Sequence, residues 1–205
     1  MAATATSRSI APRRDRAAKA AGIAKAKALA PDLPARIGST PTTKLRGNPD
    51  IFGQLVEDHD RHRALLAMIE QTQGKSDDRK RLFDELVHEL KAHAAAEEQA
   101  LWSTVLRKPA TTDFARHAIA EHKEIDEMLA DLAARDMSST GWLKRFAGLK
   151  DEYLHHIREE EQEQFVAAEQ HLSAAEVRYM RGVFVRRKKS EKDAAVIERK
   201  IKLKD

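Results

Sequence analysis

Apolar residues recur every three to four positions along much of the chain, with charged residues between them. A period of this kind places the apolar side chains on one face of a helix. No segment alternates in the way of a strand, and Val and Ile are sparse. The pattern predicts four long amphipathic helices, over residues 50–71, 78–107, 114–135 and 142–171.

Helix-breaking residues separate the four helices. Pro109 ends the second, and short runs containing Gly and Ser separate the others. Short connections join antiparallel neighbours, so we expect an all-α fold, an up-down-up-down four-helix bundle over residues 49–172. Ser173 and Glu176 then have the spacing of a capping box, which predicts a basic helical extension over residues 173–205.

Positive charge gathers at the two ends of the chain. Residues 1–48 hold ten Lys/Arg and two Asp/Glu, residues 181–205 hold ten and four, and the whole chain has a net charge of +4. The first of these segments lacks apolar periodicity and contains Pro31, Pro34 and Pro41. We therefore expect it to be a disordered, flexible basic arm. An acidic bundle carries two basic tails, which we expect to be separable from it.

The composition excludes several classes of protein. The chain has no cysteine, so it forms no disulfide, thiolate metal site or cysteine nucleophile. No apolar run approaches the about 20 residues of a membrane span, and the N-terminus lacks the apolar segment of a secretory signal. We expect a cytoplasmic protein with no membrane partner.

Four histidines stand on the apolar faces of the predicted helices, one on each. In the second and fourth helices a glutamate follows the histidine by four residues and shares its face. A buried imidazole–carboxylate pair is costly unless a cation compensates it, and six inward ligands suit two bridged ions. Ligands without thiolate favour iron over manganese or zinc. The expected metal ligands are His59, His93, Glu97, His122, His156 and Glu160.

Other polar residues lie close to these six. His62 is inward, and three roles are left open for it: a metal ligand, an outer hydrogen-bond partner or a group that faces a substrate. His117, at the edge of its helix, is a second candidate outer partner. His155 shares its face with acidic residues and is expected to be exposed. Glu98 and Glu161 are expected to be surface charge, although Glu161 would replace its neighbour if the helix were rotated.

The candidate ligands belong to four motifs, which follow one another along the predicted helices. These are Asp58-His59, His93-x-x-x-Glu97-Glu98, Glu121-His122 and His156-x-x-x-Glu160-Glu161. In order and spacing they resemble the hemerythrin-like cation-binding domain, over about residues 50–172. The resemblance implies a non-haem centre of two iron ions, bridged by an oxo or hydroxo group and by Glu97 and Glu160. It implies a protein that binds, senses or reacts with dioxygen, peroxide or nitric oxide, and leaves open catalase- or peroxidase-like or nitric oxide scavenging activity.

The sequence departs from the oxygen-carrying hemerythrins at two positions. Those proteins bind iron through five histidines, two of them one turn apart on the third helix. With His122 aligned to the second of these, Ala118 stands where the first would be. The carboxylate of the fourth helix also follows its histidine by four residues instead of five. Because a methyl group cannot bind a metal, these departures predict an open metal position and a reactive centre.

The basic tails support an alternative function of another class. A metal-regulated protein would bind nucleic acid or another partner through them. No aromatic residue is interleaved with the charges of the N-terminal arm to stack on bases. Any nucleic-acid binding is therefore expected to be weak and nonspecific.

Overall fold

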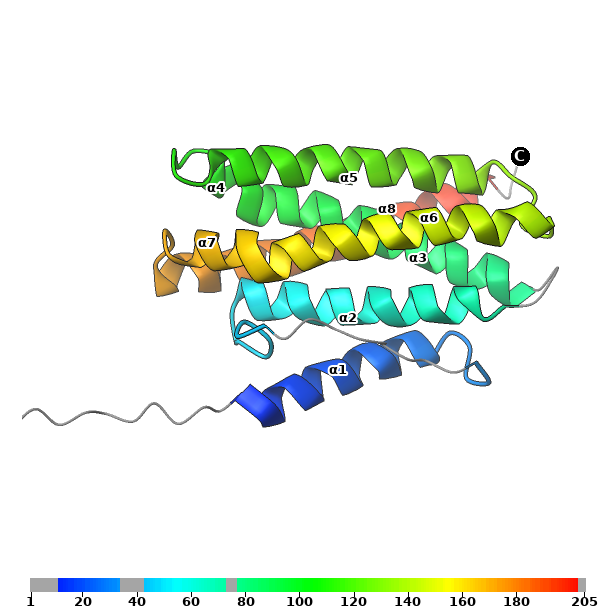
Figure 1. Cartoon of the computed structure of the whole chain (residues 1–205), viewed down its shortest axis with the longest axis horizontal. Coiled ribbons are helices and arrows are strands. Elements are labelled where there is room, and N and C mark those ends of the chain that lie inside the picture. The colour runs from blue at the N-terminus through cyan, green and yellow to red at the C-terminus, as the bar shows by residue number, and fades with distance from the viewer. Residues whose placement is uncertain (1–10, 34–42, 73–76, 203–205) are drawn as a thin grey trace, which may run out of the picture.

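The computed structural model describes residues 11–33, 43–72 and 77–202. These residues form helices and no strand, and none of their helices has the length and apolarity to cross a membrane. Four helices run alternately up and down beside one another, which confirms the expected bundle (Figure 1). Their main segments are α2 (Ile51–Glu70), α3 (Asp77–Glu97), α5 (Thr112–Ala133) and α6 (Thr140–Glu159).

The second and fourth helices of the bundle each contain a π-helical turn. α3 continues into η1 (Glu98–Trp102) and α4 (Ser103–Val105), and α6 continues into η2 (Glu160–Gln164) and α7 (Phe165–Glu169). Such a turn inserts one residue into the helix and is frequent at functional sites. Both turns stand at the glutamate end of a His-x-x-x-Glu motif, which the apolar period alone does not reveal.

The bundle interior is apolar toward both ends and polar between them. One apolar cluster includes Phe83 and Trp142, whose rings pack edge-on at 5.1 Å. The other includes Trp102 and Phe165. Along each bundle helix, the inward histidine lies between residues of the two clusters. Close-packed side chains on both sides therefore hold the polar middle in place.

The N-terminal region differs from the disordered arm expected over residues 1–48. Ala11–Lys27 form helix α1, which packs against α2 (Figure 1). Ala26 of α1 is buried, and its small side chain lets the two helices approach closely. The expectation of a disordered arm is wrong for this helix, whereas residues 1–10 and 34–42 lie outside the described part of the chain.

Gly22→Ala is expected to lower stability, although alanine favours helices. A Cβ at Gly22 would lie 2.9 Å from the backbone nitrogen of Arg61 in α2, closer than real contacts allow. We expect the lost contact between α1 and α2 to outweigh the gain of about 1 kcal/mol in helix propensity. Gly141→Ala is the control, since a Cβ there meets nothing within 4 Å. Thermal denaturation measures both, and a raised melting temperature for Gly22→Ala would contradict the docking of α1.

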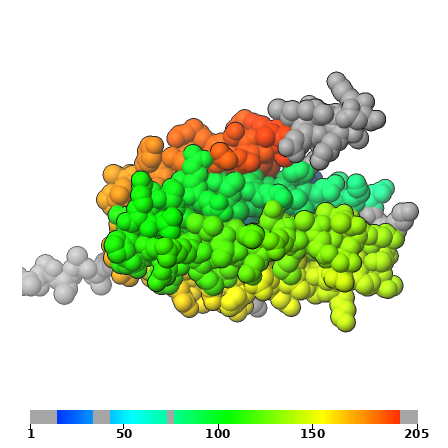
Figure 2. Space-filling view, turned by 90° about the horizontal axis from the view of Figure 1, so that it is seen from above, coloured from blue at the N-terminus to red at the C-terminus, as the bar shows by residue number. Residues whose placement is uncertain are grey.

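The C-terminal extension is a helix, as expected. Ser173 and Glu176 form the capping box: the Glu176 carboxylate accepts from the Ser173 N–H at 2.7 Å, and Ser173 Oγ accepts from the Glu176 N–H at 3.2 Å. Helix α8 (Ala174–Lys202) then lies along α3 and contacts α2, on the outside of the bundle (Figure 2). Its Phe184 is buried in the second apolar cluster.

Both basic tails are tied to the acidic bundle by ion pairs. Opposite charges attract, and here the paired segments also pack against the bundle. The described parts of the tails therefore pack on the bundle. The expectation that the metal site is kept without the tails stays a prediction. The pairs include Lys25–Glu57 at 2.6 Å, Lys44–Glu169 at 2.7 Å, Arg46–Asp60 and Lys188–Asp58 at 2.6 Å.

Candidate metal centre

Four imidazoles and two carboxylates meet in the polar middle of the bundle. Each bundle helix supplies one imidazole, and the continuous second and fourth helices each supply one carboxylate. Glu97 connects two of these helices, with Oε2 3.6 Å from His93 Nε2 and 3.5 Å from His122 Nε2. All three side chains are buried.

Glu160 makes the corresponding connection on the other side. Its Oε2 lies 3.4 Å from His59 Nε2, and its Oε1 lies 3.5 Å from His156 Nε2. His59 Nε2 is in turn 3.3 Å from His93 Nε2, which joins the two halves. The structure therefore brings together all six side chains that the sequence nominates as metal ligands.

An outer ring of carboxylates contacts the second nitrogen of each imidazole. Each carboxylate belongs to a helix that neighbours the helix of its histidine. Each is also adjacent in sequence to one of the six central residues. The ring is closed. The carboxylate on α2 contacts the imidazole on α3, the one on η1 contacts that on α5, the one on α5 contacts that on α6, and the one on η2 contacts that on α2. The pairs are His93–Asp58 at 3.3 Å, with His122–Glu98, His156–Glu121 and His59–Glu161 at 2.9 Å, all through Nδ1.

The outer ring selects the tautomer of all four imidazoles. An ionised carboxylate only accepts hydrogen bonds, so Nδ1 of each ring carries the hydrogen. In the neutral ring the lone pair then stands on Nε2 and faces the centre. A neutral imidazole held in this way by a carboxylate is the form that binds a metal ion.

Central atoms lack the partners that a protein interior normally supplies. Within the described residues, both oxygens of Glu97, both oxygens of Glu160 and His122 Nε2 are buried without a hydrogen bond. Burial and the charge of Glu97 raise the pKa of Glu160 well above its usual value. Burial also opposes the charge of Glu97, but the nearby imidazoles of His122 and His93 lower its pKa to about 2. A cation would let both carboxylates ionise, so these residues fit metal ions.

Glu161 and Glu98 are not the surface charges that the sequence suggested. Glu161 is completely buried, with Oε1 2.9 Å from Arg63 Nη2 and equally close to His59 Nδ1. Both glutamates lie in the π turn η2, where Glu161 contacts His59 and Arg63 of α2 while Glu160 faces the centre. Glu98 is partly exposed yet accepts from an imidazole. The sequence did contain a signal for this role, because Glu98 and Glu161 each directly follow a central glutamate.

Cations from outside the four bundle helices support the outer ring. Lys188 of α8 lies 2.6 Å from Asp58, the partner of His93, and is itself nearly buried. Arg46, which precedes α2, is buried and lies 3.9 Å from Glu161 Oε2. The two basic tails thus reach the carboxylates that orient two of the central imidazoles, which the charge pattern alone did not indicate.

His62 is buried beside the centre, in contact with a tyrosine. Its Nδ1 is 2.6 Å from the Tyr153 hydroxyl, and its ring packs edge-on against the His93 ring at 5.0 Å. It does not contact the outer nitrogen of a central imidazole. Burial and the nearby charges of Glu160 and Glu97 raise the pKa of Tyr153 well above its usual value, so the hydroxyl keeps its proton. The apolar pattern of the sequence indicates no functional role for Tyr153.

His117 does not contact a central imidazole, as an outer hydrogen-bond partner would. Its side chain is exposed, and its Nε2 is 3.1 Å from Glu159 Oε2 and 3.4 Å from Glu121 Oε1. It therefore reaches His156 only through Glu121. His155 is exposed, as expected, and contacts Glu159 at 3.1 Å.

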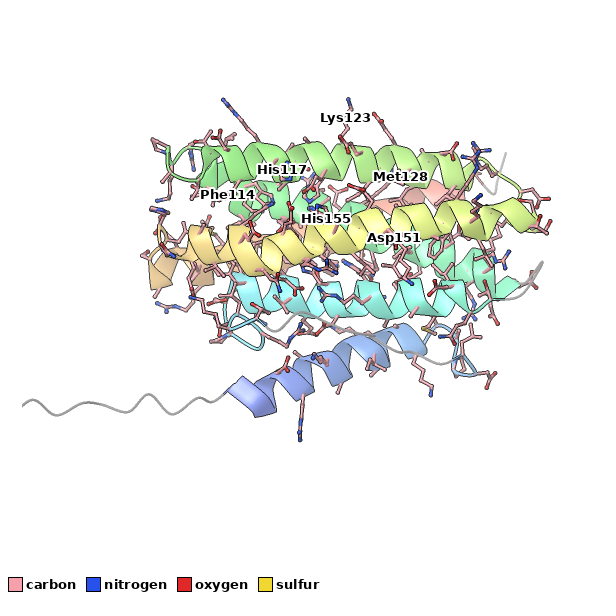
Figure 3. The ribbon with its side chains drawn as sticks, viewed as in Figure 1. Phe114, His117, Lys123, Met128, Asp151 and His155 are labelled. Carbon is pink, nitrogen blue, oxygen red and sulfur yellow. The ribbon has the colours of Figure 1, made fainter. Side chains whose placement is uncertain are left out.

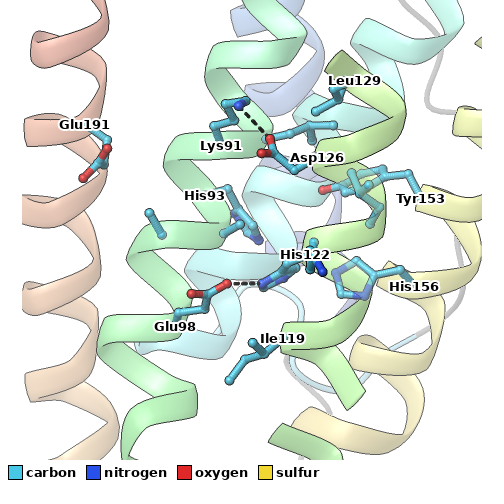
Figure 4. A pocket seen from close by; sticks show the side chains of 15 residues that line it. Lys91, His93, Glu98, Ile119, His122, Asp126, Leu129, Tyr153, His156 and Glu191 are labelled. Atoms are coloured by element: carbon cyan, nitrogen blue, oxygen red, sulfur yellow. Dashed lines mark hydrogen bonds and ion pairs between the residues drawn. The ribbon is translucent and has the colours of Figure 1, made fainter. Parts of the chain in front are cut away.

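A cavity of about 470 Å³ leads to the central imidazoles between α3 and α5 (Figure 4). His93, His122, His156 and Tyr153 line it, together with apolar side chains such as Ile119. An ion pair of 2.7 Å between Lys91 and Asp126 stands at its exposed side. The cavity gives a small molecule a route to the centre.

The helical bundle and the converging nitrogen and oxygen ligands define a metal-binding bundle protein. The Hemerythrin HHE cation binding domain matches residues 50–168, more than half of the chain, and the protein belongs to that family. It is therefore a hemerythrin-like, metal-binding protein. The matched residues include every bundle helix and all six central side chains, but neither α1 nor α8.

A solved structure from the same family supports the fold. The crystal structure of a Hemerythrin HHE cation binding domain-containing protein from Mycobacterium kansasii is 25% identical, with a TM-score of 0.66. The similarity covers 73% of this chain and 91% of that one. No curated protein matches the chain.

Proposed function

We propose that the protein holds two iron ions between Glu97 and Glu160 and reacts there with dioxygen, peroxide or nitric oxide. The observation that carries the proposal is the pair of buried carboxylates without hydrogen bonds, placed among four imidazoles with inward Nε2 atoms. Two such carboxylates suit bridging, and imidazole with carboxylate suits iron. Manganese and zinc remain alternatives for the same ligands.

Six protein side chains would hold the ions. His59, His93, His122 and His156 would each give one nitrogen, and the two glutamates would lie between the ions. Iron would supply the capacity to bind and reduce a small oxidant. Ala118 is completely buried one turn before His122 and offers no ligand atom, which favours a centre with an open position.

The cavity between α3 and α5 supports a small, uncharged substrate. Leu90, Ile119, Ile125 and Leu129 line it, and its Lys91 and Asp126 already pair with each other, so the cavity favours a molecule that carries little charge. Tyr153 stands where the cavity reaches the imidazoles, with its hydroxyl against His62 Nδ1. The pair can hold a proton beside the centre and deliver it to a reacting oxygen.

Metal content and an optical spectrum test the proposal. We expect about two iron ions per chain and a charge-transfer band that changes when the reduced, anaerobic protein meets dioxygen. Nitric oxide and peroxide are tested in the same cell, and steady-state turnover of peroxide would distinguish an enzyme from a carrier or sensor. A chain that holds zinc alone, with no spectral response to any of the three molecules, would contradict the proposal.

Tyr153→Phe is expected to keep the metal and slow peroxide turnover by about a hundredfold, the lower range for loss of an acid–base group. The phenyl ring still fills the space, so stability should fall by only about 1 kcal/mol for the lost hydrogen bond. Tyr179→Phe is the matched control, because Tyr179 is 71% exposed on α8. Equal turnover in both variants would exclude a proton-delivering role for Tyr153.

The alternative function, nucleic-acid or partner binding through the tails, has less support. Several of their charges are already used in ion pairs with the bundle, which leaves less charge for a polyanion. Salt-sensitive DNA binding by the full chain would favour it. The cytoplasmic location stays a prediction.

A further inference from the structure

A second pair of His-x-x-x-Glu motifs lies nearer the surface. Its residues Glu121, His155 and Glu159 directly precede the central residues His122, His156 and Glu160. His117 and Glu121 are four residues apart on α5, and His155 and Glu159 are four residues apart on α6. Residues with this spacing share one face of a helix. The two pairs lie on neighbouring helices, and Figure 3 shows His117 and His155 on the same side of the bundle.

The donor atoms of this cluster lie at distances that suit one small ion. His117 Nε2 is 3.1 Å from Glu159 Oε2 and 3.4 Å from Glu121 Oε1, and the three atoms lie within 4.8 Å of one another. A tetrahedral zinc site with bonds of about 2.0–2.1 Å has neighbouring ligands about 3.3–3.4 Å apart. His155 Nε2 lies beside these three donors on the exposed side, 3.1 Å from the second carboxylate oxygen of Glu159, Oε1.

The cluster lacks a permanent positive charge of its own. Among the described residues, the ion pairs of Glu121 and Glu159 are all with histidines. When the imidazoles are neutral, the carboxylates of Glu121 on α5 and Glu159 on α6 have no Lys or Arg partner in the part of the chain that the structure describes. A divalent cation would balance both charges and use the imidazole lone pairs.

We propose that His117, Glu121 and Glu159, with His155, form a second metal site for a zinc-type divalent cation. The site is independent of which metal the buried centre holds. It is connected to that centre, because Glu121 Oε2 accepts the hydrogen bond of His156 Nδ1 at 2.9 Å. A cation on the other oxygen of Glu121 draws electron density away from this bond. Occupancy of the surface site therefore alters the ligand strength of His156.

Zinc binding to the metal-loaded protein tests the proposal. The protein is equilibrated with Zn²⁺, and its zinc and resident metal are counted before and after. We expect one additional zinc per chain with no loss of resident metal, and a shift in the optical spectrum of the buried centre if that metal absorbs. His117→Ala and Glu159→Gln should each weaken the added site about tenfold or more.

The control is His171→Ala, which changes an exposed histidine away from the cluster. It should bind the additional zinc as the unchanged protein does. Because the altered residues lie at the surface, helix content measured by circular dichroism should stay constant. Absence of additional zinc, equal binding by His117→Ala and Glu159→Gln, or displacement of the resident metal would each overturn the proposal.

Discussion

His122→Ala and His93→Ala are each expected to lose at least one metal ion per chain and to melt at a lower temperature. Each substitution removes one nitrogen that faces Glu97. It also leaves an outer carboxylate, Glu98 or Asp58, without its imidazole. A metal that binds only the folded chain stabilises it by about 2.7 kcal/mol at a free concentration a hundred times its Kd. We expect a loss of this order when one ion is lost.

Metal analysis after gel filtration, with thermal denaturation in the presence and absence of a chelator, measures both effects. The chelator should lower the melting temperature of the unchanged protein more than that of the variants, because the variants hold less metal. His171→Ala serves as the control and should behave as the unchanged protein does. Full metal retention by both variants would refute the assignment of these ligands.

Lys188→Met is expected to lower stability by about 3 kcal/mol, the lower end for breaking a buried ion pair. Lys188 Nζ lies 2.6 Å from Asp58 Oδ2 and 2.8 Å from Glu89 Oε2. Burial opposes its charge, but these two carboxylates raise the pKa of Lys188, so it is charged in the folded chain. Glu89 keeps Arg61 at 2.8 Å after the change, whereas Asp58 keeps only His93.

The same variant should also weaken the metal centre. Asp58 orients His93, and Phe184, one turn before Lys188, packs edge-on against the His93 ring at 5.5 Å. With Asp58 free to turn away, we expect metal affinity to fall by about tenfold, the lower range for a disturbed outer partner. Competition with a chelator measures this, and Lys188→Arg should restore part of the loss.

Lys189→Met provides the matched control for Lys188→Met. Lys189 is the next residue on α8, its side chain is 77% exposed, and it pairs with Asp193 one turn away. An exposed pair of this kind contributes less than about 0.5 kcal/mol. If both variants matched the unchanged protein in stability and metal affinity, α8 would not stabilise the metal centre, which would contradict the role given to Lys188.

The apolar period was enough to predict the bundle because each helix buries one continuous stripe. Positions such as Leu86 and Leu149 recur at helical spacing, and the same period carried the inward histidines with them. Two motifs of histidine and glutamate four residues apart then placed imidazole and carboxylate on the same buried faces. The six central residues could therefore be nominated from this spacing together with the apolar neighbours that mark the inward face.

The π turns and the outer ring depended on the tertiary structure. Glu161 lies beside Glu160 in sequence, and a straight α-helix would turn the two in different directions. In the π turn η2, which inserts one residue, both side chains are buried, Glu160 toward the centre and Glu161 toward His59. Helical periodicity cannot reveal such an insertion, because the apolar positions beyond it are few.

Sequence by itself determined the bundle helices, their order and the candidate ligands, since these follow from local spacing. Only the tertiary structure decided what the basic tails do. The sequence pattern showed no partner for these charges, because Lys188 and its partner Asp58 are 130 residues apart. Packing brings that lysine from α8, and Arg46 from before α2, to the carboxylates that orient the central histidines. Contacts between distant residues carry no local signal, so the role of the tails emerges only from the folded chain.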